Sequence, residues 1–254
     1  MSEAVVNLFD RVAERYDTVV PFFGEFGRIC VDALPAPVPG DRLLDIGAGV
    51  GALAVPAHAK GFAVTATDAA PGMVGRLTAN HPELDARVMD AAHLDFDDDT
   101  FAVVTAGFVL HLLDDPAAAL REIKRVLRPG GLVAFTTLGR VPDDFEAGDG
   151  STALFVEFAK HLPPGGGMGA PFEPLDSMAA AGFTEIEETA VRVELPVPDA
   201  ETFWEWYQTH GTRKFFDDLD EVRRAEFRDR LIADLEARDR IVLRRYAWLY
   251  RGRA

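Results

Sequence analysis

The chain has 254 residues, 48% of them hydrophobic, and a net charge of −16 that arises from 42 Asp and Glu against 26 Lys and Arg. This size and hydrophobic content suit an α/β domain with a modest elaboration and exclude a disordered chain, while the acidic charge disfavours nucleic acid as a partner. No apolar run approaches the roughly 18 residues of a membrane span, and the single cysteine, Cys30, excludes an intrachain disulfide and fits a cytoplasmic location.

The N-terminal region is predicted to be helical over residues 4–34, because apolar side chains from Val6 to Tyr16 recur at helical spacing. A proline-rich linker at residues 35–39 separates this region from the rest of the chain. We expect residues 1–34 to form a helical lid segment.

From residue 40 onward, short apolar runs alternate with segments of helical character. The predicted strands are residues 42–46, 62–67, 84–89, 101–106 and 132–138. The predicted helices between them are residues 50–60, 71–80 and 116–127. Alternation at this spacing predicts a mostly parallel sheet with right-handed crossovers. Ligands of such sheets bind outside the carboxyl ends of the strands, where the strand order reverses.

The alternation is interrupted after residue 139. Residues 140–171 are rich in glycine and proline around one short predicted helix, and residues 199–239 are helical and carry several aromatic side chains. A sixth strand is predicted at residues 183–195, and the apolar run at residues 241–250 is predicted to be an edge strand.

The strongest local signal is the sequence LLDIGAGVG from Leu43 to Gly51, where a predicted strand turns into a helix. Glycines in such a turn let the backbone approach a ligand closely, and the helix N-terminus offers free N–H groups. Gly47, Gly49 and Ala52 also satisfy the dinucleotide pattern G-x-G-x-x-G/A. The turn alone therefore leaves the identity of the nucleotide cofactor open.

Two further acids follow the next two predicted strands. Asp68 lies 21 residues after Gly47, where a carboxylate can accept both ribose hydroxyls, and Asp90 is placed to accept the amino group of adenine. A single acid at a strand end is commonly just solvated. Three acids, Asp45 included, at successive strand ends around one switch point indicate a nucleoside-containing cofactor.

Together these residues resemble the class I methyltransferases that depend on S-adenosylmethionine (SAM). The resemblance rests on the glycine turn with Asp45, Asp68 and Asp90, and on the sequence RPGG at residues 128–131. The sequences at residues 9–17 and 111–116 are similar to the small-molecule branch that includes the quinone-biosynthesis C-methyltransferases. The resemblance covers residues 7–138 and implies SAM, because a nicotinamide site has no such Pro-Gly-Gly turn.

The resemblance implies an α/β fold with a Rossmann-like, doubly wound, seven-stranded sheet whose last strand is antiparallel, together with a mainly helical lid. We expect the SAM-binding core at residues 40–139, its continuation at residues 172–198 and its terminal strand at residues 240–254. The lid is expected to comprise an N-terminal helical segment at residues 1–34, a loop-rich insertion at residues 140–171 and a helical insertion at residues 199–239.

The resemblance also implies a role for matching positions. The glycines line the methionine part of SAM, Asp45 lies near its ammonium, and Tyr16 folds over the cofactor from the N-terminal helix, unless it is a core tyrosine. The residues expected to bind the cofactor are Tyr16, Asp45, Gly47, Ala48, Gly49, Gly51, Asp68, Ala69, Met73, Asp90, Ala91, Ala92, Gly107 and Phe108.

Methyl transfer is an in-line displacement, so the protein mainly orients the nucleophile and removes its proton where needed. His111 follows the fourth predicted strand and is the candidate base; the alternative is that it caps the helix near Asp115 or packs structurally. The candidates for acceptor contact are His111, Trp204, Tyr207 and His210, although the aromatics also suit a packed core face. No spacing of metal ligands is found, so no metal is expected.

We therefore expect a cytoplasmic enzyme that methylates oxygen or carbon of a small, partly hydrophobic acceptor, such as a natural product or a quinone-like compound. Two alternatives stay open: a tRNA or protein methyltransferase, and a SAM-binding protein of this fold that catalyses a non-methylating step. The sequence specifies neither the acceptor nor the oligomeric state.

Overall fold

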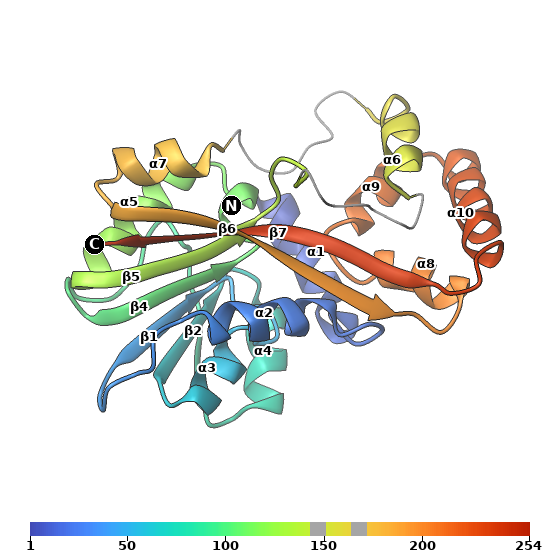
Figure 1. Cartoon of the computed structure of the whole chain (residues 1–254). Helices are drawn as coiled ribbons and strands as arrows, with labels where there is room; N and C mark the ends of the chain where they lie inside the picture. The colour runs from blue at the N-terminus through green and yellow to red at the C-terminus, as the bar shows by residue number, and fades with distance from the viewer. Residues whose placement is uncertain (143–150, 164–171) are drawn as a thin grey trace.

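The computed structural model describes residues 1–142, 151–163 and 172–254. Within these ranges the chain forms a seven-stranded sheet in the order β3-β2-β1-β4-β5-β7-β6 (Figure 1). The strands are β1 Arg42–Ile46, β2 Ala63–Asp68, β3 Asp85–Val88, β4 Phe101–Gly107, β5 Leu127–Thr137, β6 Thr184–Pro196 and β7 Val242–Arg253. The first five pair in parallel, and β7 is antiparallel to both of its neighbours, which confirms the predicted fold class.

The predicted edge position of the last strand is wrong. β7 lies between β5 and β6, with Phe135 opposite Tyr250 on one side and Ala190 opposite Trp248 on the other. Leu249 and Tyr250 are buried. The apolar run of β7 is therefore that of an interior strand, and β6 forms the edge.

Helices cover both faces of the sheet because neighbouring strand residues point to opposite sides. Leu43 packs with α2 and α3 in one core cluster, and Leu44 packs with α5 and α7 in the other. The core helices are α2 Phe22–Asp32, α3 Ala54–Lys60, α4 Pro71–Asn80, α5 Pro116–Val126 and α7 Pro174–Ala180.

The predicted N-terminal helix is broken into α1 (Glu3–Val12), a short 3-10 turn η1 (Ala13–Arg15) and α2. Asp17 adopts a positive φ of 56°, and its carboxylate accepts the N–H groups of Phe23 at 2.8 Å and Gly24 at 2.7 Å. By accepting these two N–H groups, Asp17 stabilises the first turn of α2, which begins as a separate helix. Tyr16 therefore extends from the connection between the helices, and its predicted place on a helix is wrong.

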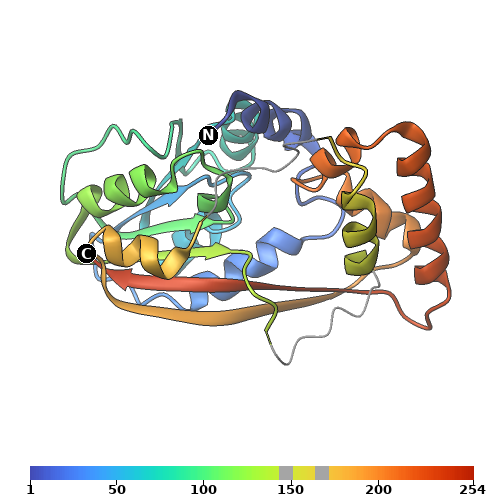
Figure 2. The same ribbon diagram turned by 90° about the horizontal axis from the view of Figure 1, so that it is seen from above.

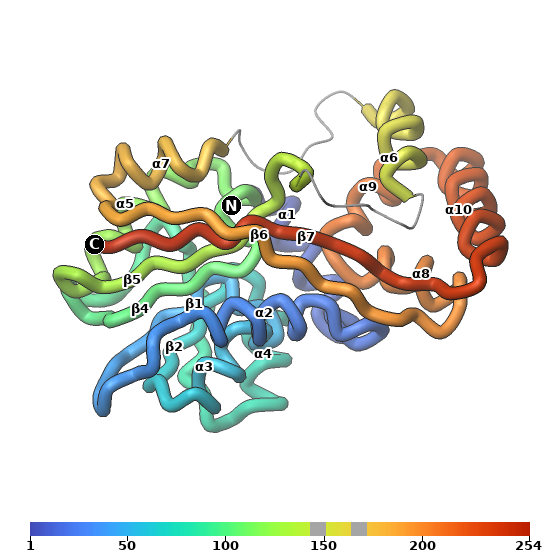
Figure 3. The backbone as a smooth tube through the Cα atoms, in the orientation of Figure 1, coloured from blue at the N-terminus to red at the C-terminus, as the bar shows by residue number. Residues whose placement is uncertain are grey.

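β6 and β7 form a long hairpin that projects past the rest of the sheet. β5 pairs with β7 only over Trp248–Arg253, so residues 242–247 pair with β6 alone. Figure 3 traces the two strands as continuous tubes from the core to the far end of the molecule. Strand β7 thus belongs both to the core sheet and to the projecting hairpin.

Four helices gather at the distal end of this hairpin in both Figure 1 and Figure 2. We call them the lid helices: α6 Ser151–Ala159, α8 Ala200–Tyr207, α9 Arg213–Asp218 and α10 Glu221–Glu236. Among them, α6 and α10 pack through Phe158 and Phe227, whose rings are 5.3 Å apart, and through the Glu157–Arg230 ion pair. Much of the predicted loop-rich insertion, including its three consecutive glycines, lies outside the described residues. No helix in the described ranges is long and apolar enough to cross a bilayer.

Candidate active site

The loop after β1 exposes backbone at the carboxyl edge of the sheet. Gly47 and Gly49 have φ values of 62° and 55°, a left-handed conformation that favours glycine. A Cβ atom at Gly47 would lie 2.2 Å from a methyl carbon of Val109, whereas the nearest atom to a Cβ at Gly49 is a ring carbon of Tyr16 at 3.8 Å. Gly47 is thus required by packing, while Gly49 leaves the backbone accessible under Tyr16.

Asp45 is fully buried near the N-terminus of α3, the helix that follows this loop. Its Oδ1 accepts the hydroxyl of Thr105 at 2.8 Å, and its Oδ2 has no hydrogen-bond partner among the described residues. Burial raises the pKa of Asp45 to about 7. An orphaned carboxylate oxygen at this position suits the ammonium of a SAM methionine, either directly or through a water molecule.

Asp68, at the end of β2, is joined to the same loop. Its Oδ2 accepts the N–H of Gly49 at 2.9 Å, and its Oδ1 accepts the N–H of Ala70 at 2.8 Å. Burial raises its pKa. The lone pairs left on this carboxylate suit two ribose hydroxyls, so the residues present fit the cofactor that the sequence predicts.

A small cavity of about 50 Å³ lies over this part of the loop. Most of the predicted cofactor residues at the switch point meet there, together with Phe9 from α1 and residues that follow β4. Its lining is Met1, Phe9, Tyr16, Gly47, Gly49, Asp68, Ala70, Met73, Gly107, Phe108, Val109 and Leu112. A second small cavity beside it is lined by Ala48 and Thr136, among others. We call the two together the cofactor cavity.

The predicted adenine end is more exposed. Asp90 follows β3 on the surface, and its Oδ1 accepts the N–H of Ala92 at 3.1 Å. Neither of these residues lines the cofactor cavity, and neither do Ala91, Ala69 and Gly51. The structure thus brings Gly47, Gly49, Asp68, Met73 and Tyr16 together, and it leaves those five other residues and the fully buried Asp45 outside the cavity lining.

Phe108 stands between the cofactor cavity and a larger one. It has a φ of 57°, which costs a non-glycine residue about 1–2 kcal/mol. Its N–H donates to the carbonyl of Thr136 at 3.0 Å, and its ring meets Phe23 and Phe26 edge-on at 5.7 and 5.2 Å. Strain held by surrounding contacts is common at functional sites, and here it fixes a ring between two cavities.

The larger cavity, which we call the acceptor cavity, has a volume of about 420 Å³. It shares Phe9, Tyr16, Phe23, Phe108 and Leu112 with the cofactor cavity. Aromatic rings from the N-terminal segment and the lid form most of its wall. The remaining lining is Phe22, His111, Leu138, Ser151, Thr152, Phe155, Trp206, Tyr207, His210, Gly211, Thr212, Lys214, Phe215, Arg244, Arg245 and Tyr246.

His111 lies in the 3-10 turn η2 (Leu110–Leu112) and lines the acceptor cavity. Its Nδ1 is buried without a hydrogen-bond partner among the described residues, and burial lowers its pKa to about 4. The imidazole is therefore neutral at pH 7. His111 does not cap the following helix, because Asp115 does so by accepting the N–H of Ala118.

Of the other predicted acceptor contacts, two line the acceptor cavity and one does not. Both nitrogens of His210 are bonded, Nδ1 to the carbonyl of Trp206 and Nε2 to the hydroxyl of Thr212, each at 2.8 Å, and burial lowers its pKa to about 3. His210 and the buried Tyr207 both line the acceptor cavity. Trp204 is not in the lining and packs against Phe216 at 4.8 Å inside the lid.

Several wall residues escaped the sequence analysis. Phe22 and Phe23 are the first two residues of α2, and Arg244 and Arg245 lie within the last apolar run. Two adjacent arginines in an otherwise apolar strand were the signal that could have identified the second pair. In the described ranges, no three His, Cys, Asp or Glu side chains gather as a metal site requires.

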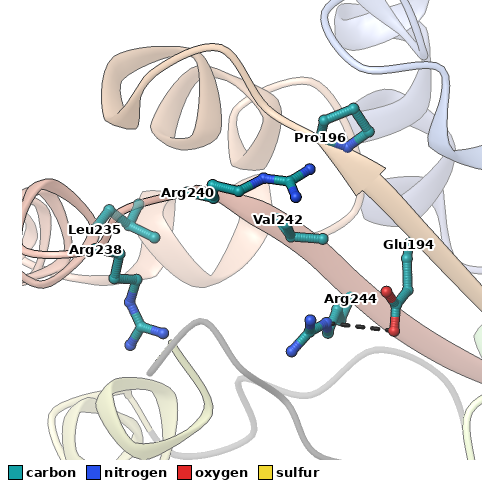
Figure 4. Close-up of a pocket in the computed structure, with 7 residues that line it drawn as sticks. All are labelled: Glu194, Pro196, Leu235, Arg238, Arg240, Val242 and Arg244. Carbon is teal, nitrogen blue, oxygen red and sulfur yellow. Dashed lines mark ion pairs between the residues drawn. The ribbon is translucent and has the colours of Figure 1, made fainter.

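An outer hollow of about 400 Å³ lies at the distal end of the hairpin and shares only Arg244 with the acceptor cavity. Figure 4 shows Arg244 paired with Glu194 across the hairpin, at 3.3 Å. The other lining residues are Pro196, Leu235, Arg238, Arg240 and Val242. None of them lines the cofactor cavity.

Comparisons with known proteins find methyltransferases among the relatives of this chain. Residues 44–135 match a methyltransferase domain family. The chain is 33% identical over 256 residues to nocamycin O-methyltransferase of Saccharothrix syringae, and this match covers 91% of the chain and 90% of that protein. It is 38% identical over 134 residues to demethylmenaquinone methyltransferase of Renibacterium salmoninarum, and this match covers 51% of the chain and 56% of that protein. In fold it resembles the methyltransferase solved in complex with the Haloferax volcanii Trm112 methyltransferase activator, with a TM-score of 0.63, 22% identity, and 98% and 97% coverage.

Proposed function

The chain belongs to the SAM-dependent methyltransferases, and from that premise we propose that it methylates an oxygen atom of a small, partly hydrophobic acceptor. The relative named an O-methyltransferase matches 91% of the chain, lid included, whereas the demethylmenaquinone methyltransferase matches only 51%. Because the acceptor cavity is built largely from the N-terminal segment and the lid, the longer match bears more directly on the acceptor.

One observation carries the proposal: the acceptor cavity and the cofactor cavity share a wall. Tyr16 and Phe108 line both. A cavity of about 420 Å³ falls in the range of small-molecule sites. A nucleophile held against Phe108 would thus be next to the cofactor, and the surrounding rings would exclude water.

Bound SAM supplies an electrophilic methyl group on a sulfonium. The glycine loop would hold its methionine part, with Asp45 near the ammonium and Asp68 at the ribose. Tyr16, whose ring stacks on Phe23 at 4.9 Å, would cover the cofactor from the side of the N-terminal segment.

His111 would accept the proton of the acceptor hydroxyl. His111 lines the acceptor cavity, its Nδ1 has no hydrogen-bond partner among the described residues, and its low pKa keeps the ring neutral at pH 7. A weakly basic imidazole serves an acidic hydroxyl better than a weakly acidic one, because proton transfer between groups of distant pKa is unfavourable. Phenols and enols are therefore better matched than simple alcohols.

The test is a screen of phenols, enols and carboxylic acids with purified enzyme and SAM, with tRNA and protein as alternative acceptors. We expect S-adenosylhomocysteine and a product heavier by one CH₂, whose new methyl carbon has the NMR shift of an O–CH₃ group. A C–CH₃ or N–CH₃ product, or methylated tRNA, would contradict the oxygen assignment. Binding of NAD without binding of SAM would contradict the cofactor roles given to this loop.

A further inference from the structure

Thr212 brings a hydroxyl to the wall of the acceptor cavity, at the turn between α8 and α9. Its Oγ1 lies 2.8 Å from Nε2 of His210 and 3.2 Å from the carbonyl oxygen of Tyr207. A threonine hydroxyl has one proton and two lone pairs. What this hydroxyl offers to a ligand therefore depends on whether its proton is already used by these two neighbours.

The tautomer of His210 follows from its other ring nitrogen. Nδ1 lies 2.8 Å from the carbonyl oxygen of Trp206, which can only accept, so Nδ1 holds a proton. Burial, and to a lesser extent the charge of Arg245, lowers the pKa of His210 to about 3. The ring is therefore neutral at pH 7, and its single N–H proton is on Nδ1. Nε2 has a lone pair and no proton.

The proton of Thr212 is consequently used inside the protein. Nε2 of His210 and the carbonyl of Tyr207 both accept, so the hydroxyl donates to one of them or is shared between them. Thr212 also occupies the N-cap position of α9, where a threonine oxygen usually accepts a helix N–H, but its side chain makes no such bond. Within the described part of the chain, the lone pairs of this oxygen are left for the cavity.

A hydroxyl in this state accepts a hydrogen bond from a ligand and has no proton to give to one. A ligand that displaces water from Thr212 must replace the donor that the water supplied, because an unpaired polar atom at a desolvated site costs free energy. An O–H or N–H group meets this need. An ether, a carbonyl or a halogen brings its own lone pairs against those of Thr212 and does not.

Phe23 links Thr212 to the cofactor side of the cavity. Its ring lies 5.7 Å from that of Phe108, which borders the cofactor cavity, and 5.5 Å from that of His210, the partner of Thr212. A flat molecule that lies along Phe23 would have one end near Phe108 and the other near Thr212. The group that Thr212 binds would thus be separate from the oxygen that is methylated.

We propose that Thr212 determines acceptor specificity by accepting a hydrogen bond from a second hydroxyl, or from an N–H group, of a flat, conjugated acceptor whose other hydroxyl is methylated beside Phe108. This inference rests on the proposed O-methyl transfer, and it narrows the acceptor class to dihydroxy or amino-hydroxy compounds. His210 is the positioning residue, because its bare Nε2 directs the proton of Thr212 away from the cavity.

The transfer itself leaves this second group unchanged. The lone pair of the reacting oxygen forms the new C–O bond, and the C–S bond breaks with its electron pair kept by sulfur. The proton of the reacting hydroxyl passes to His111 and then to water. The donor at Thr212 keeps its proton throughout, so the methylated product is still recognised at Thr212.

The experiment compares 6-methoxy-2-naphthol with 6-fluoro-2-methoxynaphthalene by calorimetry on enzyme saturated with S-adenosylhomocysteine. Both probes have the methoxy group of a methylated product, and only the naphthol has a donor. A neutral hydrogen bond predicts about 2- to 12-fold tighter binding of the naphthol. Thr212→Val, which keeps the shape of the side chain, should remove this preference, and Thr212→Ser should retain it.

Thr209→Val is the matched control. The hydroxyl of Thr209 donates to the same Trp206 carbonyl, at 2.7 Å, but Thr209 does not line the acceptor cavity. This variant should therefore keep the preference for the naphthol. Thermal melts of each variant establish that it is folded.

Nitrogen NMR of enzyme labelled in its histidine rings tests the premise without any change at Thr212. We expect the signal of His210, assigned by its loss in His210→Phe, to show the proton on Nδ1. A proton on Nε2 would overturn the proposal, because Thr212 would then accept from His210 and could turn its own proton to the ligand.

Equal binding of the two probes by the native enzyme, or no binding of either, would also overturn the proposal. So would an unchanged preference in folded Thr212→Val. These outcomes are distinct from failure of the proposed function, which would show as failure of S-adenosylhomocysteine itself to bind, or as methylation at an atom other than oxygen in the acceptor screen.

Discussion

The carboxylate of Asp68 accepts the backbone N–H of Gly49 at 2.9 Å and so ties the end of β2 to the glycine loop. Asp68→Ala should weaken SAM binding about 10- to 150-fold, because it would remove the charge-assisted hydrogen bonds proposed to the ribose and release the loop. Calorimetry measures the effect. Asp97→Ala, which removes an exposed acid beyond β3, is the matched control. Equal affinities of the two variants would remove Asp68 from the site.

SAM binding should strengthen as pH rises through about 7, the pKa to which burial raises Asp45. The ionised carboxylate attracts the ammonium of SAM, and the protonated form does not. Asp45→Asn, which keeps the size of the side chain, should bind SAM more weakly at pH 8 and lose this pH dependence. Dissociation constants measured from pH 6 to pH 8.5 provide the check, and an unaltered pH profile in the variant would contradict the assignment.

Without cofactor, Asp17 and Asp45 should each contribute a loss of stability as pH rises from about 4 to about 7, opposed by His111 and His210, whose lowered pKa values contribute a gain over the same range. Burial raises the pKa of Asp17 to about 6 and that of Asp45 to about 7. The folded chain therefore holds protons that the unfolded chain has already released, and the stabilisation is lost as pH rises through the folded pKa. In urea unfolding at pH 8, Asp45→Asn should be more stable than the native chain by about 1–3 kcal/mol; a destabilised variant would show that the ionised carboxylate is favourable in the fold.

His111→Ala should lower turnover about 100- to 10,000-fold and leave SAM affinity nearly unchanged, if His111 takes the proton. Because the pKa of His111 is lowered to about 4, its neutral form persists down to that pH, and activity should show no inflection near 6.5 from this residue. His111→Gln separates the roles, since an amide accepts a hydrogen bond but does not take a proton. High turnover in both variants would exclude His111 as the base.

Phe108→Gly should be more stable than Phe108→Ala by up to about 1 kcal/mol. Glycine tolerates the φ of 57° at this position, although its greater freedom in the unfolded chain offsets part of the gain. The same pair of changes at Phe26, inside α2, should give the reverse order, because glycine disfavours a helix. Urea midpoints of the four variants give the answer, and a less stable Phe108→Gly would show that the backbone there is not strained.

The core could be predicted from sequence because its signals are local. The strands that end near Asp45 and at Asp68, and the glycine loop after the first of them, each depend on a few consecutive residues. They form where the sequence pattern predicts them. The place of β7 could not be predicted in this way. Whether a strand lies inside a sheet or at its edge depends on which distant strand pairs with it, here β6.

The acceptor cavity was predicted only in part, for a related reason: three of the candidate acceptor contacts, His111, Tyr207 and His210, line it, but the rest of its wall was not named. Its wall joins segments nearly 200 residues apart, as the contacts of Phe22 with Trp206 at 5.1 Å and of Arg15 with Glu205 show. Helical spacing indicated that the aromatics of α8 are buried, but it did not distinguish Trp206, which lines the cavity, from Trp204, which does not. That choice depends on how α8 is rotated against its neighbours.

The long hairpin inserts three of the four lid helices, α8, α9 and α10, into the chain as one segment. Pro196 and Val242 are paired residues on neighbouring strands, so the segment between them leaves and re-enters the sheet across one strand spacing of about 4.8 Å. Such a segment can be exchanged as a unit, because its two ends lie side by side in the sheet as the ends of a hairpin loop do. Grafting residues 197–241 from a relative onto this sheet would replace α8, α9 and α10 while every residue of the glycine loop stayed in place.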